Sequence, residues 1–115
     1  MQVSKLSDMW RGWFIGDFEP SVLRTKSFEV GVLEHKAGEQ WPAHYHPEGT
    51  EYNVLLEGSM NVCNTELSAG DVFVIEPGEV ADPTFYQDCK ILCVKIPSNP
   101  NDKIRVGKQG YIFST

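Results

Sequence analysis

Short runs of β-branched and aromatic residues, each closed by turn-forming residues, recur along most of the chain and limit the folds that it can adopt. Runs of three to nine residues with such side chains are typical of β-strands. The ten glycines and seven prolines leave no clear stretch of a dozen residues with a helical apolar period. The pattern therefore predicts an all-β sandwich or closed barrel. The expected strands cover residues 13–15, 27–35, 52–56, 60–63, 72–75 and 90–96.

The length of 115 residues suits one compact domain with one core. We expect a single domain over residues 1–115, with the barrel core at about 25–97. An N-terminal strand or arm at 1–24 and a C-terminal loop and strand at 98–115 would flank this core. The apolar residues of the arm between Met9 and Phe14 could contact a partner or add a strand that closes the core.

Charge and hydropathy exclude several classes of partner. The formal net charge is −6 and no run of Lys or Arg occurs, which argues against nucleic acid and anionic membranes as partners. No apolar stretch approaches the roughly 20 residues of a membrane span, and the N-terminus lacks the apolar core of a signal peptide. Three cysteines, an odd number, indicate free thiols. We therefore expect a cytoplasmic protein.

The residues with the clearest chemistry lie in segment 38–58. His44 and His46 are two positions apart, so on a strand both imidazoles point to the same side. Glu51 opens the next β-run, and a turn at Gly49 would return its carboxylate to the histidine pair. Two neutral imidazoles and one carboxylate suit Fe, Mn, Ni, Co or Zn and leave positions for water or substrate. The pattern predicts a divalent-metal site without identifying the metal.

The same segment resembles the first motif of the cupin superfamily. That motif consists of Gly, five residues, His-x-His, three or four residues, Glu, six residues and Gly. Here Gly38, His44, His46, Glu51 and Gly58 fall in register with it. The resemblance covers about residues 25–97 and implies a double-stranded β-helix, which is a jelly-roll barrel.

The second cupin motif is only partly present. It begins with Gly70, Asp71 and an apolar strand, but the position of the histidine that is the fourth metal ligand in the family holds Ala81. Asp82 is adjacent and could replace that ligand if a bulge turned its side chain inward. Without a bulge, strand alternation would point Asp82 to the opposite face.

Other side chains near the motifs are candidates for a substrate pocket. Asn53 shares the parity of Glu51 and is expected to line the pocket. Met60 and Phe73 could form its apolar wall, although core packing would explain them equally well. His35 lies outside the motif, before a Lys-Ala-Gly turn, and is expected to be solvated.

These observations leave several functions open. The main hypothesis is a small cupin that binds a divalent metal through two His and one Glu and acts on or binds a small molecule, with carbohydrate-related compounds as candidates. One alternative is a metal-free isomerase or epimerase of nucleotide sugars that uses the histidine pair for proton transfer. Another is a non-catalytic barrel that binds a small molecule. The sequence leaves open whether the protein is an enzyme, and the resemblance to small cupins implies a homodimer.

Overall fold

The computed structural model describes residues 1–106 and, as backbone alone, residues 112–114. This part of the chain is nearly all β-structure, as the sequence predicts. Its one short 3-10 helix is η1 (Leu6–Asp8). The strands in chain order are β1 (Trp13–Ile15), β2 (Glu29–His35), β3 (His44–Tyr45), β4 (Thr50–Glu57), β5 (Ser59–Val62), β6 (Thr65–Ser68), β7 (Val72–Ile75), β8 (Thr84–Phe85), β9 (Cys89–Ile96), β10 (Ile104–Val106) and β11 (Ile112–Ser114).

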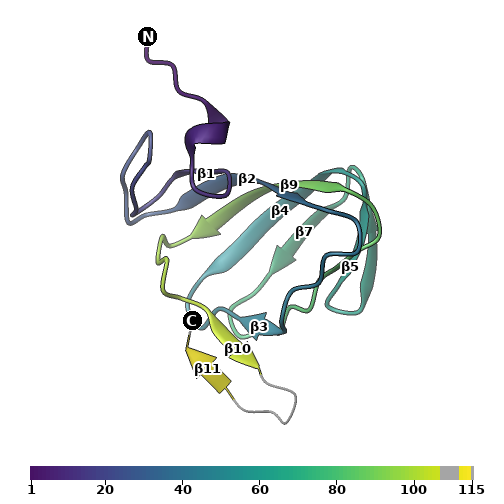
Figure 1. The fold of residues 1–115 in the computed structure, drawn as a ribbon. Coiled ribbons are helices and arrows are strands. Elements are labelled where there is room, and N and C mark those ends of the chain that lie inside the picture. Colours follow the sequence, from purple (N-terminus) through teal and green to yellow (C-terminus); the bar gives the residue numbers. More distant parts are fainter. Residues whose placement is uncertain (107–111, 115) are drawn as a thin grey trace.

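The strands form one large sheet and two small ones (Figure 1). The large sheet is antiparallel, in the order β1-β2-β9-β4-β7, and the small sheets have the orders β6-β5-β8 and β11-β10-β3. Between β2 and β10 the chain passes back and forth, with β2, β4, β7 and β9 in the large sheet and the intervening strands in the small ones. This winding is the predicted double-stranded β-helix.

Every run that the sequence predicts to be a strand contains a strand in the structure. The elements missed are mostly very short. Strands β3 and β8 have two residues each, which is too short to show a periodic pattern. Strand β10 falls inside the segment expected to begin as a loop. Residues 107–111 and 115 of that segment lie outside the described residues.

The core fills one end of the barrel. Leu33, Ile91 and Leu55 occupy one row across β2, β9 and β4, and Leu55 has no exposed surface. Met60 pairs with Phe85 on the facing small sheet, and both are 2% exposed. Several of these side chains, among them Leu33, Met60 and Phe85, also line the cavity described below.

The outer face of the large sheet carries exposed apolar side chains. They come from three neighbouring strands and are Tyr52, Leu56, Val72, Val74 and Ile96. The homodimer expected from the sequence stays a prediction, and this face is a candidate surface for it. Within the described residues, no helix has the length and apolar character needed to cross a membrane.

Candidate metal and small-molecule site

The open end of the barrel is built on a polar row across the large sheet. Lys95 on β9 lies opposite Glu29 on β2 and opposite Glu51 on β4. In the next inward-facing row, Asn53 lies between Cys93 and Phe73. Because residues two apart share a face, this register turns Glu51 and Asn53 toward the same interior space.

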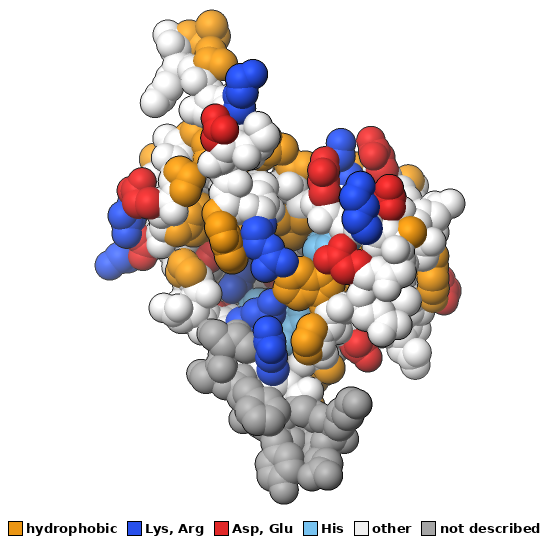
Figure 2. Space-filling view, in the orientation of Figure 1, with side chains coloured by type: hydrophobic (Ala, Val, Ile, Leu, Met, Phe, Trp, Pro, Cys, Tyr) orange, Lys and Arg blue, Asp and Glu red, His pale blue; other side chains and the backbone are white. Residues whose placement is uncertain are grey.

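That space is a cavity of about 900 Å³. Figure 2 shows one face of the molecule, on which Lys and Arg side chains lie close to histidine side chains that can be seen from outside. All the predicted ligand and pocket residues except Asp82 line this cavity: His44, His46, Glu51, Asn53, Met60 and Phe73. Its wall also contains residues that the sequence did not indicate, namely Arg11, Glu29, His35, Trp41, Lys95 and Lys103.

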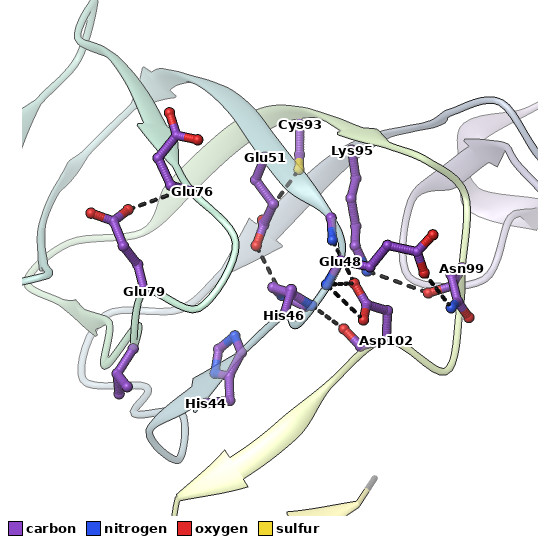
Figure 3. A network of polar contacts seen from close by, with 12 residues as sticks. His44, His46, Glu48, Glu51, Glu76, Glu79, Cys93, Lys95, Asn99 and Asp102 are labelled. Carbon is purple, nitrogen blue, oxygen red and sulfur yellow. Dashed lines mark hydrogen bonds and ion pairs between the residues drawn. The ribbon is translucent and has the colours of Figure 1, made fainter.

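His46 is held at both ring nitrogens (Figure 3). Its Nδ1–H donates to the backbone carbonyl of Asp102, and its Nε2 lies 2.9 Å from Oε2 of Glu51. Both contacts are to acceptor oxygens, so each ring nitrogen can donate, and the ring and the carboxylate form an ion pair whenever the ring is protonated. The turn predicted at Gly49 thus returns Glu51 to the histidine strand.

His44 presents its second nitrogen to the cavity. Its Nδ1–H donates to the carbonyl of Pro42 at 3.0 Å, which leaves Nε2 without a proton in the neutral ring. Burial, together with the charges of Lys103 and His46, holds the pKa of His44 below its ordinary value of 6.5. The ring planes of His44 and His46 are nearly perpendicular, at 83°, with centroids 5.3 Å apart.

Glu51 is ionised despite its burial. Its side chain is 16% exposed, and burial opposes ionisation. The hydrogen bond from His46 and the positive charges of His46 and Lys95 outweigh burial and lower the pKa of Glu51 from its ordinary value of 4.5. The thiol of Cys93 also donates to Oε1 of Glu51, at 3.5 Å.

Acid is therefore expected to destabilise the fold through Glu51. A carboxyl group whose pKa is lower in the folded than in the unfolded protein stabilises the fold at pH values above the unfolded pKa, here 4.5. This contribution is lost as the pH falls from 4.5 through the lower pKa of the folded state. Denaturant unfolding at neutral pH and at several values below 4.5 would measure the effect. Glu51→Gln should flatten this acid dependence, whereas Glu76→Gln, at an exposed carboxylate, should follow the parent. Equal acid dependence in Glu51→Gln and the parent would contradict the assignment.

Asp102 organises the loop that carries the site. Its side chain is buried and accepts hydrogen bonds from the backbone N–H of Glu48 at 3.2 Å and of Gly49 at 2.7 Å. Its own carbonyl accepts from His46. One residue thus holds both the turn before Glu51 and the ring of His46. Asp102 follows a Pro-Asn-rich loop, and no local pattern in the sequence marks it as part of a site.

His35 corrects an expectation. It was expected to be solvated, but its side chain is 14% exposed and its ring stacks on Phe85, with centroids 4.2 Å apart and planes at 11°. The reason is parity, because His35 continues the inward series of Gly31 and Leu33 to the end of β2. The same alternation was readable from the sequence.

Solved structures share this architecture. No family model matches the sequence, and no significant match to a curated protein is found. A conserved protein with a double-stranded β-helix domain from Klebsiella pneumoniae superposes with a TM-score of 0.63 at 21% identity, over 85% of this chain and 86% of that one. A protein with a cupin-like fold from Ralstonia eutropha gives 0.66 at 9% identity, over 89% and 60%.

The chain has the cupin fold. The resemblance carried by the first motif is thereby confirmed at the level of architecture. A third solved structure with this fold is an acetylacetone dioxygenase from Acinetobacter johnsonii, with a TM-score of 0.64 at 16% identity. The superposition covers 77% of this chain and 61% of the dioxygenase, so the chain spans about three-fifths of the length of that protein and of the Ralstonia one.

The second motif of this chain departs from the cupin pattern, as the sequence indicates. Ala81 lies opposite His44, and the two residues exchange backbone hydrogen bonds of 2.9 and 2.7 Å. Ala81 is buried and lines the cavity, in the place where the family has its fourth ligand. Asp82 instead lines a separate hollow with Cys63 and Glu79. The structure therefore does not bring Asp82 to His44, His46 and Glu51.

The side chains of His44, His46 and Glu51 suit a metal ion chemically, although His46 and Glu51 form a direct hydrogen-bonded pair in this structure. Metal-binding histidines usually donate their other ring N–H to a carbonyl or carboxylate, and His44 and His46 both do so. Among the described residues, no three His, Cys, Asp or Glu side chains already stand in a metal-binding arrangement. Nε2 of His46 and Glu51 contact each other directly, and a bound ion would have to replace this contact.

Proposed function

We propose that this cupin binds one divalent metal ion through Nε2 of His44, Nε2 of His46 and the carboxylate of Glu51, and that it holds a small molecule in the adjoining cavity. The observation that carries the proposal is the anchoring of both imidazoles. Each donates Nδ1–H to a backbone carbonyl, that of Pro42 or that of Asp102. This arrangement fixes the tautomer and turns Nε2 into the ligand atom.

Metal binding would replace a proton within the existing ion pair. Nε2 of His46 and Oε2 of Glu51 are separated by 2.9 Å, so they share one proton between them. An ion that enters must displace this proton, as is general for metal sites built from histidine and carboxylate. His44 needs no such displacement, because its lowered pKa leaves the ring neutral at pH 7. Fe, Mn, Ni, Co and Zn all accept this donor set.

The surrounding residues would position the small molecule. A bound metal would supply Lewis acidity toward a carbonyl, water or dioxygen. Asn53 points its amide into the same space, and Phe73 and Met60 provide apolar wall. The dioxygenase with this fold supports small-molecule chemistry in such a barrel. Carbohydrate-related compounds stay candidates for the occupant.

A metal-free function is the second candidate. It is favoured by Ala81, which removes the fourth ligand of the family, and by the direct contact of His46 with Glu51. A histidine held between a carboxylate and a carbonyl is suited to general acid–base catalysis, as in sugar isomerisation or epimerisation. A barrel that binds its ligand without turnover would use the same cavity.

The test is metal analysis of protein purified without an affinity tag or chelator. We expect near-stoichiometric metal in the parent, either as purified or after reloading with Fe(II), Mn(II), Co(II), Ni(II) or Zn(II). The variant His44→Ala/His46→Ala should contain none, because it lacks both imidazoles. His35→Gln is the matched control, since it removes the third histidine, whose Nδ1 contacts Glu39.

Two results would reject the metal proposal. One is the absence of metal from the parent after reloading with each of the five ions. The other is equal metal content in the parent and in His44→Ala/His46→Ala. In either case the metal-free isomerase or the binding barrel becomes the better hypothesis.

A further inference from the structure

We propose that the occupant of the cavity is a small organic anion, whose negatively charged oxygen group lies against Arg11 and Lys103 and whose body offers a hydrogen-bond acceptor to Asn53. The inference rests on the proposed function in that it names the ligand class of the same cavity. It does not depend on whether a metal is bound.

The carboxylates deep in the cavity have partners in its wall. Lys95 lies between Glu29 and Glu51 in one row across the sheet. Nε2 of His46 lies 2.9 Å from Oε2 of Glu51. Ser98 also donates to Glu29, at 3.2 Å.

Arg11 and Lys103 add positive charge nearer the opening. Both line the cavity, and both lie over the ring of Trp41, with the guanidinium carbon 4.5 Å and the ammonium nitrogen 4.7 Å from its centroid. Glu34, the other carboxylate in the wall, contacts Lys90 at 3.7 Å. Figure 2 shows Lys and Arg side chains gathered on this face of the molecule.

Arg11 and Lys103 interact through their charges. Burial lowers the pKa of Lys103, the charges of Arg11 and Arg105 lower it further, and the charge of Glu51 raises it. An anion beside them would relieve this repulsion. The chain as a whole carries −6, so it repels anions except where positive charge is concentrated locally.

Asn53 supplies the second observation. It is 4% exposed, lines the cavity, and its Nδ2 has no hydrogen-bond partner within the described part of the chain. Buried amide donors are rarely left unpaired, so a partner outside the described residues is expected. That partner must be an acceptor, such as a carbonyl, hydroxyl or carboxylate oxygen. The cavity wall thus offers hydrogen-bond donors and positive charge to one ligand.

The test compares anions with uncharged counterparts on chelator-treated protein. The probes are benzoate, lactate, phenyl phosphate and glycerol 2-phosphate, each beside benzamide, lactamide, phenol or glycerol. Thermal shift and calorimetric titration at millimolar concentration should show binding of anionic members and none, or about tenfold weaker binding, of their counterparts. Preference for the carboxylates or for the phosphates identifies which of the two groups the site takes.

Variants show whether the cations are responsible. Arg11→Gln and Lys103→Gln should each weaken anion binding about tenfold, as expected for loss of a charged hydrogen bond. Arg11→Lys and Lys103→Arg keep the charge and should retain binding. The matched control is Lys26→Gln/Lys36→Gln, which removes two exposed charges outside the cavity and should bind like the parent.

The inference would be overturned if no anion bound, if the uncharged probes bound equally well, or if Arg11→Gln/Lys103→Gln bound anions like the parent. Failure of the proposed function has a different signature. Anion binding that depends on Arg11 and Lys103 in a protein that takes up no metal would leave the inference standing and reject the metal site. Metal uptake without anion binding would leave the metal site standing and reject the inference.

Discussion

Asp102→Ala is expected to weaken metal binding by about 10- to 100-fold, the usual effect of removing a group that orients a metal ligand. It should also lower the free energy of unfolding by about 2–4 kcal/mol, because the backbone N–H groups of Glu48 and Gly49 lose their acceptor in a largely buried place. The backbone carbonyl of residue 102, which accepts from Nδ1–H of His46, stays in the variant, but it would lose its fixed position once the side chain no longer ties it to the turn at Glu48 and Gly49. Metal titration and urea unfolding measure the two effects.

Two further variants separate this role from a general loss of charge. Asp102→Asn keeps one acceptor oxygen and should fall between the parent and Asp102→Ala in both measurements. Asp88→Ala is the matched control, because Asp88 also accepts from a backbone N–H, that of Ala37, but its side chain is 68% exposed. It should cost less than about 1 kcal/mol and leave metal binding unchanged. Equal metal affinity in Asp102→Ala and the parent would show that Asp102 does not position His46.

Leu55→Ala is expected to lower the free energy of unfolding by about 2–5 kcal/mol, as large-to-small substitutions in a core do. Leu55 has no exposed surface and lies in the row that closes the apolar end of the barrel. Its neighbour Leu56 points to the other face of β4 and is 44% exposed. Leu56→Ala therefore removes the same atoms from the same strand and should cost less than about 1 kcal/mol.

Equilibrium unfolding in urea compares the pair directly. A large loss in Leu55→Ala with a small one in Leu56→Ala is the expected result. A loss in Leu56→Ala as large as that in Leu55→Ala would show that the outer face is also buried in solution, as a homodimer through this face would require.

Much of the fold could be predicted because alternation in a strand is a local property. The runs at 72–75 and 90–96 show their β-character in their own side chains, and their strands follow within a residue. The same period places Glu51 and Asn53 on one face, and both line the cavity. It also places His35 inward, against the expectation that this residue, which a turn follows, is solvated.

Part of the site could not be predicted from any local pattern. The loop before β10 brings Asp102 to His46, from 56 residues later in the chain, and places Lys103 in the cavity wall. Neither residue lies in a segment with a periodic apolar pattern, so the neighbouring sequence does not predict the direction of its side chain. Arg11 likewise enters the cavity only because the N-terminal arm lies across its wall.

The sequence by itself determined the strands, the parity of their side chains and the grouping of His44, His46 and Glu51, because each follows from a period of two and a short turn. Only the tertiary structure decided that Asp102 holds His46, that Lys95 separates two carboxylates and that Arg11 and Lys103 share Trp41. The physical reason is that these contacts join segments far apart in the chain. The closure of the barrel fixes the geometry of these contacts, and no single residue determines it.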